Sequence, residues 1–256
     1  MSIVVCCKLV PDTKDIQVKD DGSISFDKAE WIVGDFDLVA LEAGFQLAEK
    51  NGQKLIALSA GNKQLSSSKA KKTILARGPA ELVIVTDEAM ADADTHMTAQ
   101  VLAGGIKKIG SYNLVICGEG SSDLYFQQVG LQLGEILGVP TINGISEIIE
   151  MTGDKLVAKR STEEDIETVE IPLPAVISVT ADICQSRIPK MQDILKAGKK
   201  PVTEYTFQDV EGGQNQSEVV SLKAPQTVER KQVVLDGAAE EAVEALLSSL
   251  TQDGVL

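Results

Sequence analysis

The chain has 256 residues, 43% of them hydrophobic, and a formal net charge of −14 at pH 7. This charge disfavours general binding of nucleic acids or anionic membranes, because both are polyanions. No apolar run approaches the roughly 20 residues of a membrane-spanning helix, and the first ten residues lack a signal-peptide pattern. We therefore expect a globular, cytoplasmic protein with a substantial core, no nucleic-acid binding and no membrane insertion.

Side chains for metal or nucleophilic chemistry are few. His96, the single histidine, falls in the first turn of a predicted helix, where we interpret it as structural. The cysteines, none in a C-x-x-C pair, are Cys6, Cys7, Cys117 and Cys184. We interpret them as free, mostly buried thiols and predict neither a metal site nor a catalytic side chain.

Short apolar segments and amphipathic segments alternate over the first 140 or so residues. We predict strands over 2–9, 54–59, 81–86 and 114–117, and helices over about 37–49, 66–76, 94–108 and 123–137. Such alternation indicates an α/β fold with a doubly wound, mostly parallel sheet, Rossmann-like and of the adenine-nucleotide-binding type. A polar hairpin with its turn at 20–22 interrupts the first repeat.

The pattern changes after Thr141. Three alternating strands (145–151, 155–160 and 166–171) predict a small antiparallel extension, followed by an apolar strand over 173–179 and a short helix over about 189–196. We predict a nucleotide-binding α/β domain over 1–201, including a partner-recognition loop at about 181–200. Residues 202–256 would form an extended arm and an amphipathic helix over about 238–250, docked on a partner subunit or back on its own domain.

The glycine-rich loop Gly118–Asp123 follows an apolar strand. Ligands of parallel sheets bind at the carboxyl ends of the strands, so this loop, 6–8, 60–61 and the helix start at 34–37 should converge. The loop is not the dinucleotide fingerprint, because Asp123 stands where the third glycine would be. Taken alone, it supports nucleotide binding and a plain connection equally. We expect Ser121 or Ser122 to cap the helix that follows.

Four separate segments carry a resemblance to a known family. They are VVCCKLVPDT, GDFDLVALEA, GEGSSDLYFQQVGLQLGE and IPLPAVISVTADICQSRIPKMQDILKAGKKP, in that order. Together they resemble the β subunit of electron transfer flavoproteins, and most closely its FixA-type branch. The resemblance covers almost the whole chain and is weakest after about residue 208. It implies a heterodimer with an α subunit that makes most contacts to a redox-active FAD.

The resemblance also implies site residues. The nucleotide pocket would be formed by Cys6, Lys8, Gly34, Asp35, Phe36, Asp37, Ala60, Gly118, Gly120, Ser121, Ser122, Asp123, Gln127, Gln128 and Val129. Partner dehydrogenases would be bound by Ile183 and Arg187, with Ile183 as an aliphatic anchor on the loop 181–189. The alternative for Ile183 is a core residue at a strand end.

The family offers FAD or AMP for this pocket. Gln128-Val129-Gly130 resembles the electron-bifurcating members, and the loop 34–37 keeps their final Asp but lacks their Asn-Pro. Glu119 replaces a basic residue of the family, so we expect it to turn outward while the N–H groups of 120–122 bind the phosphates. We favour FAD, with AMP as the alternative.

The FAD form implies electron transfer between flavins, with NADH as substrate, an acyl-CoA dehydrogenase as partner, and ferredoxin or flavodoxin as a low-potential acceptor. The AMP form implies a housekeeping carrier with a single flavin. The rivals from other classes are an adenine-nucleotide-binding stress-type module and a scaffold without ligand.

Overall fold

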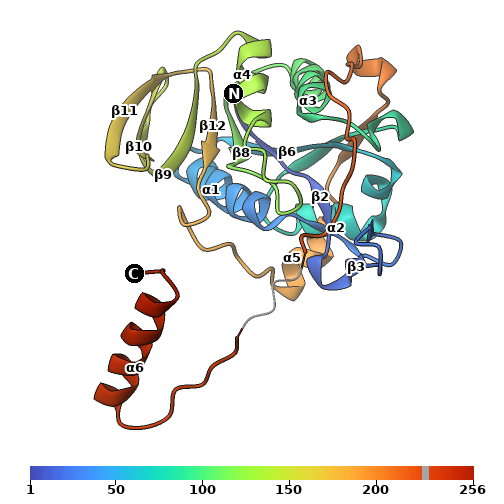
Figure 1. Cartoon of the computed structure of the whole chain (residues 1–256). Coiled ribbons are helices and arrows are strands. Elements are labelled where there is room, and N and C mark those ends of the chain that lie inside the picture. The colour runs from blue at the N-terminus through green and yellow to red at the C-terminus, as the bar shows by residue number, and fades with distance from the viewer. Residues whose placement is uncertain (227–230) are drawn as a thin grey trace.

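A nine-stranded, mostly parallel sheet forms the centre of the molecule (Figure 1). This computed structural model describes residues 1–226 and 231–256. The strands of the sheet are β1 Ser2–Cys6, β6 Lys54–Gly61, β7 Glu81–Thr86, β8 Tyr112–Gly118, β9 Thr141–Met151, β10 Lys155–Ser161, β11 Ile166–Pro172, β12 Ala175–Val179 and β13 Val202–Tyr205. Their order is β11-β10-β9-β12-β8-β1-β6-β7-β13, with β9, β10 and β11 antiparallel to one another. The predicted fold class, including the antiparallel extension, is confirmed.

Helices cover both faces of this sheet. They are α1 Asp35–Asn51, α2 Ser68–Leu75, α3 Thr95–Ile109, α4 Val129–Leu137 and α5 Met191–Ala197. A further helix, α6 Ala239–Gln252, lies apart from the sheet (Figure 1). The central strand β1 is buried on both sides: Ile3 and Val5 join the core under α1 and α2, whereas Val4 joins the core under α3 and α4. None of the described helices is long and apolar enough to cross a membrane.

The short elements lie outside the main sheet. Two small antiparallel pairs join β2 Leu9–Pro11 to β5 Trp31–Val33, and β3 Gln17–Val18 to β4 Ile24–Ser25. Single 3₁₀ turns cover Thr13–Asp15, Lys63–Ser66, Glu88–Met90 and Gln208–Val210. The predicted polar hairpin is confirmed, but the first strand ends at Cys6 instead of Leu9. The chain leaves the sheet there because Leu9 and Val10 pair with β5 instead.

The largest correction concerns the start of α4. This helix begins at Val129, and neither Ser121 nor Ser122 caps it. Tyr125 and Gln127 have φ angles of 49° and 57°, in the left-handed region, so the segment before Val129 is a loop rather than a helix. The predicted end of the helix at residue 137 is correct, and Gly138 follows it with a φ of 67°.

The segment after residue 201 is better anchored than its polar composition predicts. The edge strand β13 pairs in parallel with β7, and Val210 is buried. The arm then contacts the start of α3 through Gln216 and Ser217 and reaches the hairpin at Gly22 and Ser23. At its end, α6 lies away from the sheet and buries none of its residues (Figure 1). Docking of this helix, on a partner subunit or back on its own domain, stays a prediction. Residues 227–230 of the predicted arm lie outside the described residues.

Candidate functional site

The candidate site lies where the strand order reverses. The chain proceeds from β1 to β6 and β7 on one side, and then returns to β8 on the other side of β1. The carboxyl ends of β1 and β8 are therefore neighbours at a topological switch point, where α/β sheets bind ligands. Lys8 lies just after the end of β1, and the loop from Gly118 begins at the end of β8.

Asp37 joins three segments at this point. It lies in the first turn of α1 and is only 7% exposed. Its Oδ2 accepts a hydrogen bond of 2.7 Å from the backbone N–H of Lys8, and the backbone N–H of Gly118 lies near the carboxylate. Burial raises the pKa of Asp37 to about 7, although both N–H groups favour the ionised form.

Gly118 permits the close approach of α1 to this loop. A Cβ atom at this position would lie 2.9 Å from the Cβ of Phe36 and 3.0 Å from Oδ1 of Asp37. Any side chain here would push the start of α1 away from β8. Three of the four segments predicted to converge, 6–8, 34–37 and 118–123, therefore do so, and they fit together without space for a larger residue.

Lys8 forms an ion pair across the site. Its Nζ lies 2.6 Å from Oδ2 of Asp123. Burial raises the pKa of the Asp123 carboxyl and Lys8 lowers it, and the net shift is downward. The pair holds the far end of the 118–123 loop close to β1.

Three consecutive backbone N–H groups of this loop are available to a ligand. Within residues 1–226 and 231–256, the backbone N–H groups of Gly120, Ser121 and Ser122 donate to no protein acceptor. A run of unpaired N–H groups at a loop before a helix is a binding place for anions. We call these three N–H groups the amide cradle.

Glu119 does not point into solvent as expected. It is half-buried, and its Oε1 accepts a 3.2 Å hydrogen bond from the N–H of Ala181, in the loop after β12. Glu119 therefore joins two loops. Three carboxylates of the site accept hydrogen bonds, Asp37 and Asp123 from Lys8 and Glu119 from Ala181, whereas Asp35 is exposed.

The residues that prediction missed are three exposed apolar side chains, Leu124, Tyr125 and Phe126. The Tyr125 ring lies over Gly120, where a Cβ would be 2.4 Å from Cδ2, and its centroid is 5.2 Å from that of Phe36. We assigned these residues to a helix, whose apolar face would have explained them. Their presence in a loop, with a left-handed Tyr125, marks the loop as a candidate functional segment.

Other predicted residues lie at the periphery. Gln128 accepts from Thr95 Oγ1 at 3.0 Å and from Gln132 Nε2 at 3.2 Å, so it joins α4 to the start of α3. Ala60 lies near the end of β6 and packs against the apolar core, and Cys6 is buried. The prediction of mostly buried thiols is confirmed for Cys6, Cys7 and Cys117, whereas Cys184 is half-buried.

The predicted partner loop is fastened to α1. Arg187 donates through Nη2 to Oε1 of Glu42 at 2.9 Å and through Nε to Oε2, and its guanidinium lies 3.6 Å from the centroid of Phe45. Ile183 is half-buried and packs against the core, as its alternative interpretation holds. Ile188, which sequence reasoning passed over, is 92% exposed. A partner role for Ile183 and Arg187 stays a prediction.

Within residues 1–226 and 231–256, no three His, Cys, Asp or Glu side chains lie together in a way that would hold a metal ion.

The chain matches a known protein family. Residues 22–210, about three quarters of the chain, match the electron transfer flavoprotein domain. The chain belongs to the electron transfer flavoprotein family. The matched region contains 34–37, 118–129 and the loop 181–189, whereas Cys6 and Lys8 precede it. Membership supports electron transfer with flavin and, in general terms, a heterodimer with a partner flavoprotein subunit.

Proposed function

We propose that this chain is the β subunit of a FixA-type electron transfer flavoprotein, passing electrons between flavins, and that it holds its own FAD at the amide cradle. The observation that carries the proposal is the cradle itself. Three unpaired N–H groups stand at the switch point of a sheet in a chain of this family. A flavin nucleotide bound there would supply the redox chemistry, and the protein would position it.

The residues around the cradle fit a pyrophosphate. Three carboxylates close to the site would repel it if they faced the cradle. Instead Asp37 and Glu119 accept backbone hydrogen bonds, and Asp123 is paired with Lys8. The N–H groups are therefore left to bind phosphate oxygens, and Lys8 supplies the positive charge beside them.

The exposed apolar side chains beside the cradle favour FAD over AMP. Leu124, Tyr125 and Phe126 form a surface that water disfavours, and a flavin ring system or the partner subunit would cover it. AMP in the same pocket, in a housekeeping carrier, is the alternative. With FAD, the proposal includes NADH as electron donor, an acyl-CoA dehydrogenase as partner, and ferredoxin or flavodoxin as acceptor.

The variant Lys8→Met tests the proposed site. It removes the cation and leaves the Asp123 carboxylate unpaired beside the phosphates, so we expect roughly tenfold weaker retention of nucleotide. The measurement is the nucleotide left on the purified complex after dialysis. Lys14→Met is the matched control, because Lys14 is exposed on the neighbouring 3₁₀ turn. Equal retention by both variants would contradict the proposed site.

A further inference from the structure

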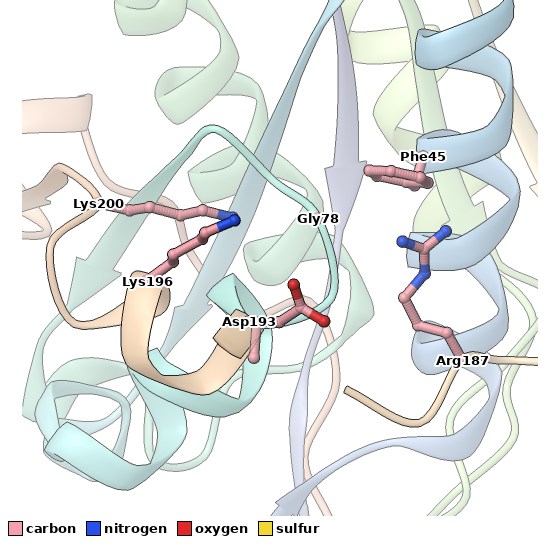
Figure 2. A pocket seen from close by; sticks show the side chains of 7 residues that line it. Phe45, Gly78, Arg187, Asp193, Lys196 and Lys200 are labelled. Carbon is pink, nitrogen blue, oxygen red and sulfur yellow. The ribbon is translucent and has the colours of Figure 1, made fainter. Parts of the chain in front are cut away.

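A second concave site lies between α1, α2 and α5 (Figure 2). It has a volume of about 160 Å³, several times the ~30 Å³ that a water molecule occupies in the liquid. It is lined by Phe45, Ala76, Gly78, Arg187, Asp193, Lys196 and Lys200. None of these residues belongs to the amide cradle or to the loops around it, so the pocket is a separate site. We call it the basic pocket.

Positive charge dominates this pocket although the chain as a whole carries −14. Lys196 and Lys200 reach into it from α5 and from the turn that follows, and Figure 2 shows both extending toward the loop at Gly78. Arg187 enters from the other side, where Glu42 neutralises it. Asp193 is then the single carboxylate in the lining, against two ammonium groups, and its Oδ2 accepts from the N–H of Lys190 at the start of α5.

Lys200 is the more buried of the two lysines. Burial lowers the pKa of Lys200, Asp193 raises it, and Lys196 lowers it by less than Asp193 raises it. The Nζ of Lys200 is held in place because it donates to the carbonyl of Leu75, at the end of α2, at 2.8 Å. An anion beside Lys200 would offset the cost of burying its charge and would accept from the Nζ protons that do not bond to Leu75.

We propose that the basic pocket binds a phosphate-type dianion. Two ammonium groups supply charge and several donors, which suits a compact anion with several acceptor oxygens better than a chloride ion. The occupied pocket would tie α5 to α2 and to the loop after Gly78. The segment that carries Ile188 would then be held at both ends. Arg187 attaches it to α1, and the bound anion would attach it to α2. No part of the proposed flavin chemistry depends on this site.

The test uses the full chain with its nucleotide retained, so that the amide cradle is occupied. Inorganic phosphate is titrated while the backbone amide of Gly78 is followed by NMR. We expect a saturable shift at Gly78. We expect Lys196→Met to weaken phosphate binding at least about fivefold, because it removes one charge-assisted donor. Lys199→Met, on the same turn but outside the pocket lining, should change the affinity less than about twofold.

The variant Asp193→Asn should change the affinity for phosphate in the opposite direction. Removing the opposing carboxylate should tighten phosphate binding, by about threefold or more. Three results would overturn the proposal. The first is the absence of a saturable shift at Gly78 at about 50 mM phosphate, well above the millimolar range of weak specific binding. The others are equal weakening of phosphate binding by Lys196→Met and Lys199→Met, and a shift at Gly78 that chloride produces as strongly as phosphate. Each of these leaves the Lys8→Met result untouched, so the two proposals stand or fall separately.

Discussion

At the scale of single residues, Asp37 carries the most information about the site. It is a buried acid whose hydrogen bond from Lys8 and close contact with the Gly118 backbone join α1 to the loops after β1 and β8. The cost of this arrangement is the desolvation of the charge, which is why the pKa is raised to about 7.

This raised pKa predicts a pH dependence of stability. The folded-state pKa of about 7 exceeds the unfolded value of ~3.9, so the folded state binds the proton more tightly. The contribution of Asp37 to the free energy of unfolding is fully present below about pH 4 and is lost as the pH rises through about 7. In Asp37→Asn this loss is absent. Between about pH 5 and pH 8 the wild type should therefore lose a few kcal/mol of unfolding free energy relative to the variant.

Chemical denaturation of both proteins at the two pH values measures this difference. Asp35→Asn is the matched control, because Asp35 lies in the same first turn but is exposed. It should keep the pH slope of the wild type. If Asp37→Asn also kept that slope, the described environment of Asp37 would be incorrect.

At the scale of elements, the loop from β12 to α5 presents an apolar side chain from a fixed base. Arg187 is held by Glu42 and Phe45, and the next residue, Ile188, is 92% exposed. Met191 and Leu195 on α5 are also exposed. A rigid base with an exposed aliphatic tip suits an anchor that enters a partner's apolar pocket.

We therefore expect Ile188→Asp to weaken electron transfer with the partner dehydrogenase at least about tenfold, because a charge would be buried in the partner's pocket. Nucleotide content should not change. The reaction is measured as the rate of flavin reduction by the dehydrogenase. Ile166→Asp on β11, where Ile166 is 69% exposed, is the control. If both variants reacted alike, Ile188 would not be the anchor.

A second element, the arm after β13, is fastened at the start of α3. The Asp94 carboxylate caps this helix at Met97 N (2.8 Å) and also accepts from Gln216 N (2.6 Å), Ser217 N (2.9 Å) and Ser217 Oγ (3.0 Å). Burial raises the pKa of Asp94, the hydrogen bonds lower it, and the result is about 2. Its contribution to stability is present above about pH 4 and is lost as the pH falls through about 2.

Asp94→Ala should release the arm. We expect a loss of about 1–2 kcal/mol from the missing helix cap, together with faster limited proteolysis near residues 214–217. Asp92→Ala is the control, because Asn215 binds the backbone carbonyl of Asp92, not its side chain. Equal cleavage rates for the two variants would show that Asp94 does not hold the arm.

At the scale of the whole molecule, the architecture follows from periodicity. β7 was predicted with its observed bounds, because Glu81–Thr86 is a short apolar run between turns. β13 was missed, because its four residues include only two apolar ones and its pairing with β7 is set by the sheet edge rather than by local pattern. Long-range pairing of this kind leaves little trace in a local window of sequence.

The site was predicted only in part, for a similar reason. Strand-end logic located the loops, and the structure brings Lys8, 34–37 and 118–123 together. Sequence could not show that the loop continues to Gln128, since left-handed Tyr125 and Gln127 look like ordinary helix residues. The engagement of Glu119 by Ala181 depends on a contact across 62 positions of sequence.

The measurement that tests the central claim most directly is the nucleotide content of the co-purified heterodimer. FAD and AMP are released by acid precipitation and counted per complex. The account predicts two FAD and no AMP, one FAD being held by the partner subunit and the other at the amide cradle. One FAD and one AMP would contradict the assignment of FAD to this chain, and the absence of any nucleotide beyond the partner's FAD would contradict the site itself.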